Sequence, residues 1–161
     1  KLRPGPLGQV KLGDLIVELT AGLQSRHPDT QIQTTVGSIA KSYGESVDLA
    51  IYRCIQEAIT NAIRHGHADK VHVDLEQQRL ANDRGHHNQI RLMVTDDGKG
   101  IAPTASKGFG LTTMTERVRS VGGECVIEDG PSGGTTVRVE IPIKQKKNEK
   151  GAPERAPESV R

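Results

Sequence analysis

One long amphipathic helix constrains the fold of this chain more than any other feature. From about Ser46 to His65, apolar residues recur three and four positions apart, the spacing of a helix with one buried face. Gly66 follows, and glycine commonly ends helices. Because so wide an apolar stripe must be covered, the helix has to pack against a sheet or other helices. The stripe consists of Ile51, Ile55, Ala58 and Ala62, widened by Cys54, Ile59 and Ile63.

Shorter segments on both sides of this helix predict a sheet. Polar and apolar residues alternate in them, as in strands with one covered face. We therefore expect an α+β fold, a two-layer sandwich of helices over a mixed, mostly antiparallel sheet. The expected elements are a helix from Leu12 to about His27, a strand at 31–36, strands at 71–76 and 90–94 separated by a polar segment with a hairpin turn at 82–85, a helix at 111–121, and strands at 124–129 and 135–141, the last ended by Pro142.

Composition narrows the class of protein. The 161 residues suffice for one ordinary domain with flanking segments. The only aromatic residues are Tyr43, Tyr52 and Phe109, so the core must be aliphatic and there is no platform for stacking bases. The net charge of +2 with scattered Lys and Arg provides no basic face, which argues against direct nucleic-acid binding. The lysines within 144–150 are interpreted as part of a solvated tail.

Cysteine use and hydropathy favour a reducing compartment. Cys54 and Cys125 lie far apart inside apolar runs and are expected to be small core residues rather than a disulfide. No apolar run has the length of a membrane span and no signal peptide is evident, so we expect a cytoplasmic segment without membrane contact. Because residue 1 is Lys rather than Met, a longer protein with a membrane anchor upstream is compatible with the sequence. The expected organisation is a linker at 1–11, a folded domain at 12–143 and a disordered tail at 144–161.

Three stretches of the sequence carry chemistry. Glu57, Asn61 and His65 are four residues apart on the long helix and share one side of it. A solvated helix face explains this spacing, but so does a site in which the amide oxygen of Asn61 binds magnesium and Glu57 acts on a nucleophile. Asp96-Asp97-Gly98-Lys99-Gly100 directly follows an apolar strand. It is either a tight turn or a ligand loop whose carboxylate accepts a hydrogen bond from an exocyclic amine, with glycines that admit a flat ring.

The third stretch, Gly108-Phe109-Gly110-Leu111, opens a helix. Free N–H groups at a helix start bind anions, although a simple loop-to-helix junction has the same composition. The stretch is neither a Walker loop nor a dinucleotide-binding glycine motif. Each stretch alone is weak evidence, but their order and their places on helix, loop and helix start are hard to obtain by chance.

Together these stretches resemble the GHKL ATPase superfamily, which includes gyrase, the ninety-kilodalton heat-shock chaperone, histidine kinases and MutL. Residues 2–143 take part in the resemblance. It implies the Bergerat ATP-binding fold and, within the superfamily, the catalytic domain of a sensor histidine kinase of the NarL/UhpB/DesK type. Residues 55–65 are similar to the N box, 96–100 to the first glycine box, 108–111 to the second and Gly134-Thr135 to the closing Gly-Thr, while Leu2-Arg3-Pro4 and the run 108–118 carry the subgroup.

The resemblance implies ATP and magnesium as ligands and gives each position a role. Asn61 would hold magnesium against the triphosphate, and Glu57 would assist the histidine that accepts the phosphate, or a water. Asp96 would bind the adenine amino group, with Thr135 nearby through water. The remaining implied nucleotide contacts are the ring-admitting Gly98 and Gly100 with Ile101, the lid-flanking Gly108 and Gly110 with Leu111, and Arg64 and His65 on the phosphate side. Relatives usually have glycine where this chain has Thr113.

The phosphate-accepting histidine is expected outside this sequence, because no histidine here lies in a helical His-Asp or His-Glu context. The resemblance therefore implies two protein partners: a histidine-bearing dimerisation domain before residue 1, and a response regulator with a helix-turn-helix output domain. Two alternatives remain open. An anti-sigma-factor serine kinase of the same superfamily would lack the Leu-Arg-Pro opening and the Gly-Leu-Thr-x-Met-x-Glu-Arg run. A non-catalytic nucleotide-binding module would not need Glu57, Asn61 and Asp96.

Overall fold

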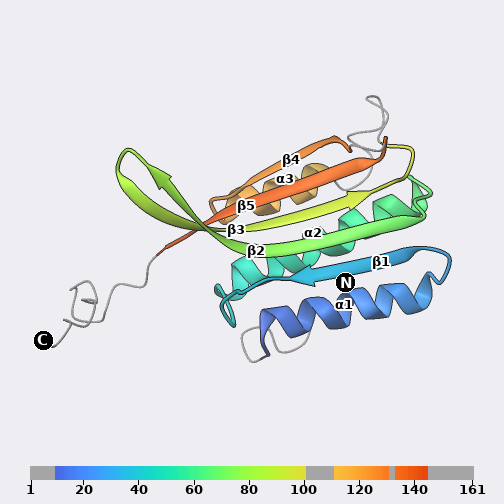
Figure 1. The fold of residues 1–161 in the computed structure, drawn as a ribbon, viewed down its shortest axis with the longest axis horizontal. Coiled ribbons are helices and arrows are strands. Elements are labelled where there is room, and N and C mark those ends of the chain that lie inside the picture. Colours follow the sequence, from blue (N-terminus) through green and yellow to red (C-terminus); the bar gives the residue numbers. More distant parts are fainter. Residues whose placement is uncertain (1–9, 101–110, 131–132, 145–161) are drawn as a thin grey trace, which may run out of the picture.

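A computed structural model of the chain describes residues 10–100, 111–130 and 133–144. These residues form three helices and five strands in two layers, with the helices against one face of the sheet (Figure 1). The expected α+β sandwich is confirmed. The elements are α1 (Leu12–Arg26), β1 (Gln31–Val36), α2 (Glu45–Arg64), β2 (Lys70–Asn82), β3 (Gly85–Asp96), α3 (Leu111–Ser120), β4 (Glu124–Asp129) and β5 (Thr135–Ile143).

The sheet is mixed, with the strand order β1-β2-β3-β5-β4. Only β1 and β2 are parallel, and α2 forms the crossover between them. The other pairs are antiparallel, and β3 and β5 are neighbours although α3 and β4 lie between them in the chain. This arrangement brings the end of β3 beside the start of β5, with Thr95 opposite Thr136. Two loops far apart in sequence therefore meet at one end of the sheet.

The core lies between the helices and the inner face of the sheet. Among the described residues it is built from aliphatic side chains, cysteine and methionine, as the scarcity of aromatic residues predicts. The apolar stripe of α2 is buried as expected, except that Ile63 is only partly buried. The inner-facing strand residues are fully or nearly fully buried and alternate with exposed or half-buried ones: Val71, Val73 and Leu75 on β2, Ile90, Leu92 and Val94 on β3, and Val137, Val139 and Ile141 on β5.

Two strand boundaries differ from the sequence expectation. The polar segment 77–88, expected as a loop, continues both strands of the β2–β3 hairpin, which projects beyond the body of the sheet (Figure 1). Ladder hydrogen bonds join backbone groups, so a hairpin with two solvated faces needs no apolar alternation. Strand β5 likewise continues through Pro142, which lies opposite Gln89. The pairing of β5 with β4 extends only to Glu140, opposite Glu124, so Pro142 lies where β5 has an open edge.

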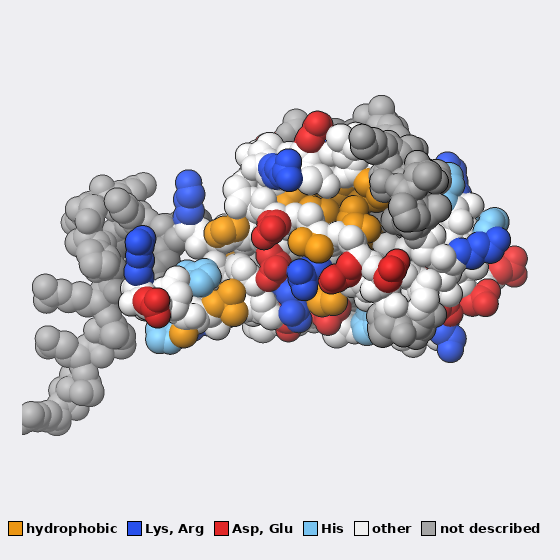
Figure 2. All heavy atoms as spheres, turned by 90° about the horizontal axis from the view of Figure 1, so that it is seen from above, with side chains coloured by type: hydrophobic (Ala, Val, Ile, Leu, Met, Phe, Trp, Pro, Cys, Tyr) orange, Lys and Arg blue, Asp and Glu red, His pale blue; other side chains and the backbone are white. Residues whose placement is uncertain are grey.

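Charged side chains of both signs cover the outer face of the sheet. The Arg91 guanidinium lies 2.6 Å from a carboxylate oxygen of Glu76, and Arg138 lies 3.7 Å from Glu128 and 3.5 Å from Glu140. Figure 2, which looks onto the β4 and α3 side, shows acidic and basic side chains interspersed without a large patch of one sign.

Within 10–100, 111–130 and 133–144, no helix combines the length and the hydropathy needed to span a bilayer.

Candidate nucleotide site

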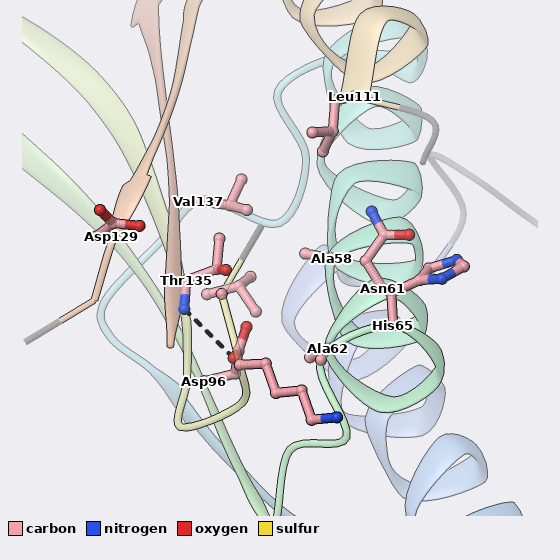
Figure 3. A pocket seen from close by; sticks show the side chains of 13 residues that line it. Ala58, Asn61, Ala62, His65, Asp96, Leu111, Asp129, Thr135 and Val137 are labelled. Atoms are coloured by element: carbon pink, nitrogen blue, oxygen red, sulfur yellow. Dashed lines mark hydrogen bonds between the residues drawn. The ribbon is translucent and has the colours of Figure 1, made fainter. Parts of the chain in front are cut away.

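A cavity of about 390 Å³ lies between α2 and the strands β3 and β5 (Figure 3). One wall is a helix face, and the other is formed by strand ends and the two loops that meet there. Its volume falls within the usual range for small-molecule sites. The described residues that line it are Ala58, Asn61, Ala62, His65, Gly66, Val94, Asp96, Lys99, Gly100, Leu111, Asp129, Thr135 and Val137.

The helix wall follows from the periodicity of α2. Residues 58, 61, 62 and 65 are three and four apart and so lie on one face. Ala58 and Ala62 are buried and small, which leaves space in front of the helix. Asn61 and His65 also line the cavity, and Figure 3 shows the imidazole of His65 turned toward the side of α2 away from Asp96. The helix thus provides a flat, mainly apolar surface with polar groups at its margin.

Glu57 and Arg64, two of the predicted site residues, lie outside this cavity. Each helical residue turns by about 100°, so positions four apart drift by about 40° around the axis. Glu57 is therefore about 80° from His65, and the exposed Arg64 lies on the same flank as Glu57. The equal spacing of Glu57, Asn61 and His65 predicted one shared face. The rotation accumulated over the two four-residue intervals from His65 to Glu57 is enough to place Glu57 outside the cavity.

Glu57 lines a separate groove of about 250 Å³ between α2 and α3. Arg53, Gln56, Thr113 and Arg117 provide polar groups there, above buried Cys54 and Met114. Within the described part of the chain, the side chains of Glu57 and Arg117 have no ion-pair or hydrogen-bond partner. The groove and the cavity share no lining residue, but both are bounded by α2 and by the first turn of α3.

The opposite wall of the cavity holds a buried carboxylate. Asp96, only 8% exposed, ends β3, and its Oδ1 accepts the N–H of Gly98 at 2.8 Å and of Thr135 at 3.3 Å. No donor from the described residues reaches Oδ2, which remains available to a ligand. Burial raises the pKa of the Asp96 carboxyl above 3.8, against the lowering effect of these two backbone donors. The group is thus a desolvated acceptor held in a fixed orientation.

Glycines allow the loops to approach this carboxylate closely. A Cβ on Gly98 would lie 2.6 Å from the carbonyl oxygen of Gly66 and 3.0 Å from Oδ1 of Asp96. A Cβ on Gly134 would overlap the backbone carbonyl of Asp96. Gly100 has φ +77°, a conformation that side chains disfavour. These positions explain the Gly-rich sequence on both sides of Asp96 and Thr135.

Asp97, the neighbour of Asp96, has a different function. It points away from the cavity, and its Oδ1 accepts the backbone N–H groups of Asp69 and Lys70, each at 2.9 Å. These backbone hydrogen bonds hold the pKa of the Asp97 carboxyl below 3.8. The acidic pair therefore divides into one carboxylate that faces the cavity and one that ties the loop to the start of β2.

Several lining residues were not identified from the sequence. Val94 and Val137 lie directly opposite each other on β3 and β5. The alternation of apolar residues in these strands predicted that both side chains face inward, but it did not predict that they contact a ligand. Lys99 and Asp129 are exposed charged residues at the rim, with no sequence signal to distinguish them. The other predicted contacts Ile101, Gly108 and Gly110 lie outside the described residues, as do residues 1–9 and 145–161.

The donor groups at the cavity fit magnesium held jointly with a ligand. The described residues contain no group of three or more His, Cys, Asp or Glu side chains that would bind a metal unaided. Magnesium typically keeps several waters and uses one or two protein oxygens with substrate phosphates, so the single amide oxygen of Asn61 suits it.

Cys54 and Cys125 are both free, and burial raises the pKa of Cys54 to about 12.

Comparison with known proteins assigns the family. Residues 46–145 match the family of histidine kinase-, DNA gyrase B- and HSP90-like ATPases, and the chain belongs to this family. The predicted membership in the GHKL superfamily is thereby confirmed. The match contains all but the first residue of α2 and the whole of β2, β3, α3, β4 and β5. The elements that build the site are among these.

The similar proteins are sensor kinases. The histidine-protein kinase/phosphatase DegS of Brevibacillus brevis is 37% identical over 103 residues, which cover 63% of this chain and 25% of DegS. The histidine-protein kinase/phosphatase UhpB of Salmonella typhimurium is 32% identical over 145 residues, covering 88% of this chain and 27% of UhpB. The ATP-binding domain of PrrB from Mycobacterium tuberculosis shares the fold, with a TM-score of 0.61, 20% identity and coverage of 84% and 96% of the two chains. The chain thus spans about a quarter of the length of these two kinases.

Proposed function

We propose that this chain is the ATP-binding catalytic domain of a two-component sensor histidine kinase. It would bind magnesium-ATP and present the γ-phosphate to a histidine on a separate dimerisation domain. The observation that carries the proposal is the buried carboxylate of Asp96, which faces the helix wall bearing Asn61 across one cavity. The family and the kinases most similar to the chain support the same function.

The base would bind at the Asp96 end of the cavity. Oδ2 of Asp96 is an acceptor for the exocyclic amine of adenine, while Oδ1 is already used by Gly98 and Thr135. Ala58, Ala62, Val94 and Val137 form apolar walls suited to the two faces of a ring.

The triphosphate would extend from the base toward Asn61 and the start of α3. Leu111, the first residue of α3, lines the cavity, so the N–H groups of the first turn of this helix are close to it. Magnesium, when bound, would neutralise phosphate charge, with the amide oxygen of Asn61 as its protein ligand. The contribution of the chain to catalysis would be positioning and electrostatic stabilisation.

The acceptor histidine would approach from the groove between α2 and α3. Glu57 lies there, outside the nucleotide cavity but one helical turn from Asn61. Its carboxylate is placed to orient an imidazole or accept its proton, without contact to the base. As the γ-phosphate moves to the imidazole nitrogen, the bond to ADP breaks and ADP remains in the cavity.

The wider context of the domain is also part of the proposal. We expect the folded domain to comprise residues 12–143 and to be cytoplasmic. The full-length protein would carry the histidine-bearing helices, and its organisation is compatible with an inner-membrane anchor. The phosphate would pass on to an aspartate of a response regulator with a helix-turn-helix output. The matched segments make up 25% of DegS and 27% of UhpB, which supports a full-length protein with further segments beside this domain.

Calorimetry and phosphotransfer together test the proposal. The 161-residue chain should bind ATP only weakly without magnesium and more tightly with it, and Asp96→Asn should remove both signals. In the full-length protein, Asn61→Asp should abolish labelling of the histidine by γ-labelled ATP. Absence of a binding heat for wild type with magnesium-ATP, or full labelling in the Asn61 variant, would refute the assignment.

A further inference from the structure

The two walls of the cavity are tied together at one end by a compact set of hydrogen bonds. The turn after α2, residues 66–69, meets the loop 96–100 there. Oδ1 of Asp97 accepts the N–H groups of Asp69 and Lys70 at 2.9 Å each, and the N–H of Asp97 donates to the Lys70 carbonyl at 3.2 Å. One side chain therefore joins the segment that carries Asp96 to the segment that follows the Asn61 helix.

Backbone contacts extend this junction to the cavity itself. The N–H of Lys99 donates to the carbonyl of Gly66 at 2.8 Å, and both residues line the cavity. Gly98 lies so close to the same carbonyl that a Cβ there would be 2.6 Å from its oxygen. The last turn of α2 thus has a fixed distance from the loop that holds the Asp96 carboxylate.

The turn itself is strained and depends on its surroundings. His67 has φ +50°, and a non-glycine residue in this conformation costs about 1–2 kcal/mol. The turn is held on its α2 side by the N–H of Ala68, which donates to the Ala62 carbonyl at 2.9 Å. On its other side, the carbonyl of Asp69 accepts the N–H of Gln31 at 2.8 Å. Among the described residues, Asp97 provides the side-chain hydrogen bonds that hold the turn 66–69 against the loop 96–100.

We infer that Asp97 is a positioning residue for the nucleotide: by holding the turn 66–69 to the loop 96–100, it sets the separation between the Asp96 wall and the Asn61 wall. This inference rests on the proposed function, since it concerns a ligand that contacts both walls. A nucleotide that reaches from Asp96 to Asn61 requires both groups at the right spacing. A nucleoside touches the helix wall only through Ala58 and Ala62, and such apolar contacts tolerate a small change in spacing better than a magnesium ligand does.

A purely structural role for Asp97 makes a different prediction. If the bonds only stabilised the end of the β2–β3 hairpin, their loss would lower overall stability and weaken every ligand equally. A positioning role instead weakens magnesium-ATP more than adenosine, because adenosine lacks the phosphates that reach toward Asn61. The two ligands therefore separate the two explanations.

NMR of the 161-residue chain provides both readouts, with three variants. Asp97→Ala removes the acceptor, Asp97→Asn keeps an oxygen acceptor without the charge, and Asp83→Ala removes an exposed carboxylate at the distant hairpin turn. We expect Asp97→Ala to weaken magnesium-ATP by about tenfold and adenosine by less than about twofold. Amide exchange at Asp69 and Lys70 should accelerate in this variant. Asp97→Asn and Asp83→Ala should stay within about twofold of wild type for both ligands.

The outcomes against the inference are distinct from those against the function. Equal weakening of adenosine and magnesium-ATP by Asp97→Ala, or wild-type affinity in that variant, overturns the positioning role. An Asp97→Asn variant as weak as Asp97→Ala also overturns it, because a charge effect would then replace the hydrogen bonds. Failure of the wild-type chain to bind magnesium-ATP overturns the proposed function itself, and the role of Asp97 with it.

Discussion

The carboxylate of Asp96, at the end of β3, accepts the backbone N–H of Thr135, at the start of β5, at 3.3 Å. The two residues are 39 positions apart, and the hydrogen bond joins the two loops that meet at the cavity. It fixes the side chain of Asp96 before any ligand arrives, so a ligand would not need to order it. The same carboxylate is desolvated, which makes the apo domain less stable than it would be with a neutral group here.

Replacing Asp96 with Asn should therefore separate stability from binding. The asparagine oxygen still accepts the two N–H groups, but the buried charge is gone. The pKa of the Asp96 carboxyl is raised above 3.8 in the folded state, so ionised Asp96 disfavours folding at neutral pH. Asp96→Asn should be more stable than wild type at pH 7, with a difference that shrinks as pH falls and vanishes below 3.8.

Urea unfolding across this pH range measures the effect, and calorimetry should show that the same variant no longer binds magnesium-ATP. The exposed Asp83 provides a matched control, since Asp83→Asn should change neither property. Lower stability of Asp96→Asn at pH 7 would show that its backbone hydrogen bonds outweigh the desolvation of its charge.

Gly134→Ala should be among the most damaging single substitutions outside the core. The new Cβ would overlap the backbone carbonyl of Asp96, and a strand backbone cannot move aside as a flexible side chain can. We expect a loss of at least about 1–3 kcal/mol of unfolding free energy, the usual cost of overpacking. Gly22→Ala, on the exposed side of α1 with nothing within 4 Å, should instead gain about 0.5–1 kcal/mol. Equal effects of the two substitutions in thermal unfolding would contradict the close approach of β5 to Asp96.

Glu57→Gln and Asn61→Ala should affect different steps. Glu57 lies in the groove between α2 and α3, whereas Asn61 lines the cavity. Asn61→Ala should weaken magnesium-ATP binding by tenfold or more, while Glu57→Gln should leave binding within about twofold of wild type. In the full-length protein, Glu57→Gln should lower the rate of histidine phosphorylation by about 10²-fold, a common contribution of a general base. A large loss of nucleotide affinity in Glu57→Gln would place its carboxylate at the nucleotide after all.

The sequence predicted the layers and the three stretches of the site better than it predicted which side chains face the ligand. The apolar stripe of α2 and the alternation on β2, β3 and β5 were sufficient for the fold, because burial imposes those periods directly. Polar side chains lie on both sides of the apolar stripe of α2, and the rotation per helical residue decides which of them face the cavity. Glu57 was therefore grouped with Asn61 by its spacing, and Arg64 was included through the resemblance, although both lie outside the cavity.

Tertiary register explains what the sequence could not show. Asp96 continues the inward alternation of Ile90, Leu92 and Val94, but no sequence pattern showed that Asp97 would bond to the start of β2. Of the rim residues, Lys99 comes from the loop after β3 and Asp129 from the end of β4, and the pairing of β5 with both strands brings them together. The hairpin turn at 82–85 was predicted, but the extension of both strands through 77–88 was not, because backbone pairing there leaves no hydrophobic pattern.

Arg64 and His65 are neighbours in sequence that should differ in effect. His65 lines the cavity, while the side chain of Arg64 is exposed on the flank of α2. His65→Ala should weaken magnesium-ATP by several-fold through lost contact, and Arg64→Ala should change it by less than about twofold. Competition binding at two salt concentrations measures both variants. A larger effect of Arg64→Ala, especially one that fades with salt, would mean that its charge reaches the phosphates.

His67 offers a test of the backbone strain in the turn 66–69 at the end of the cavity. Its φ of +50° disfavours a side chain, and its exposed side chain leaves little packing to lose. His67→Gly removes a conformational cost of about 1–2 kcal/mol and adds about 0.5–1 kcal/mol of unfolded-state entropy, so it should be neutral or stabilise by up to about 1.5 kcal/mol. His67→Val, with a branched side chain, should destabilise instead. Chemical unfolding of the two variants should give opposite shifts, and equal destabilisation by both would mean that the imidazole, rather than the backbone, determines this turn.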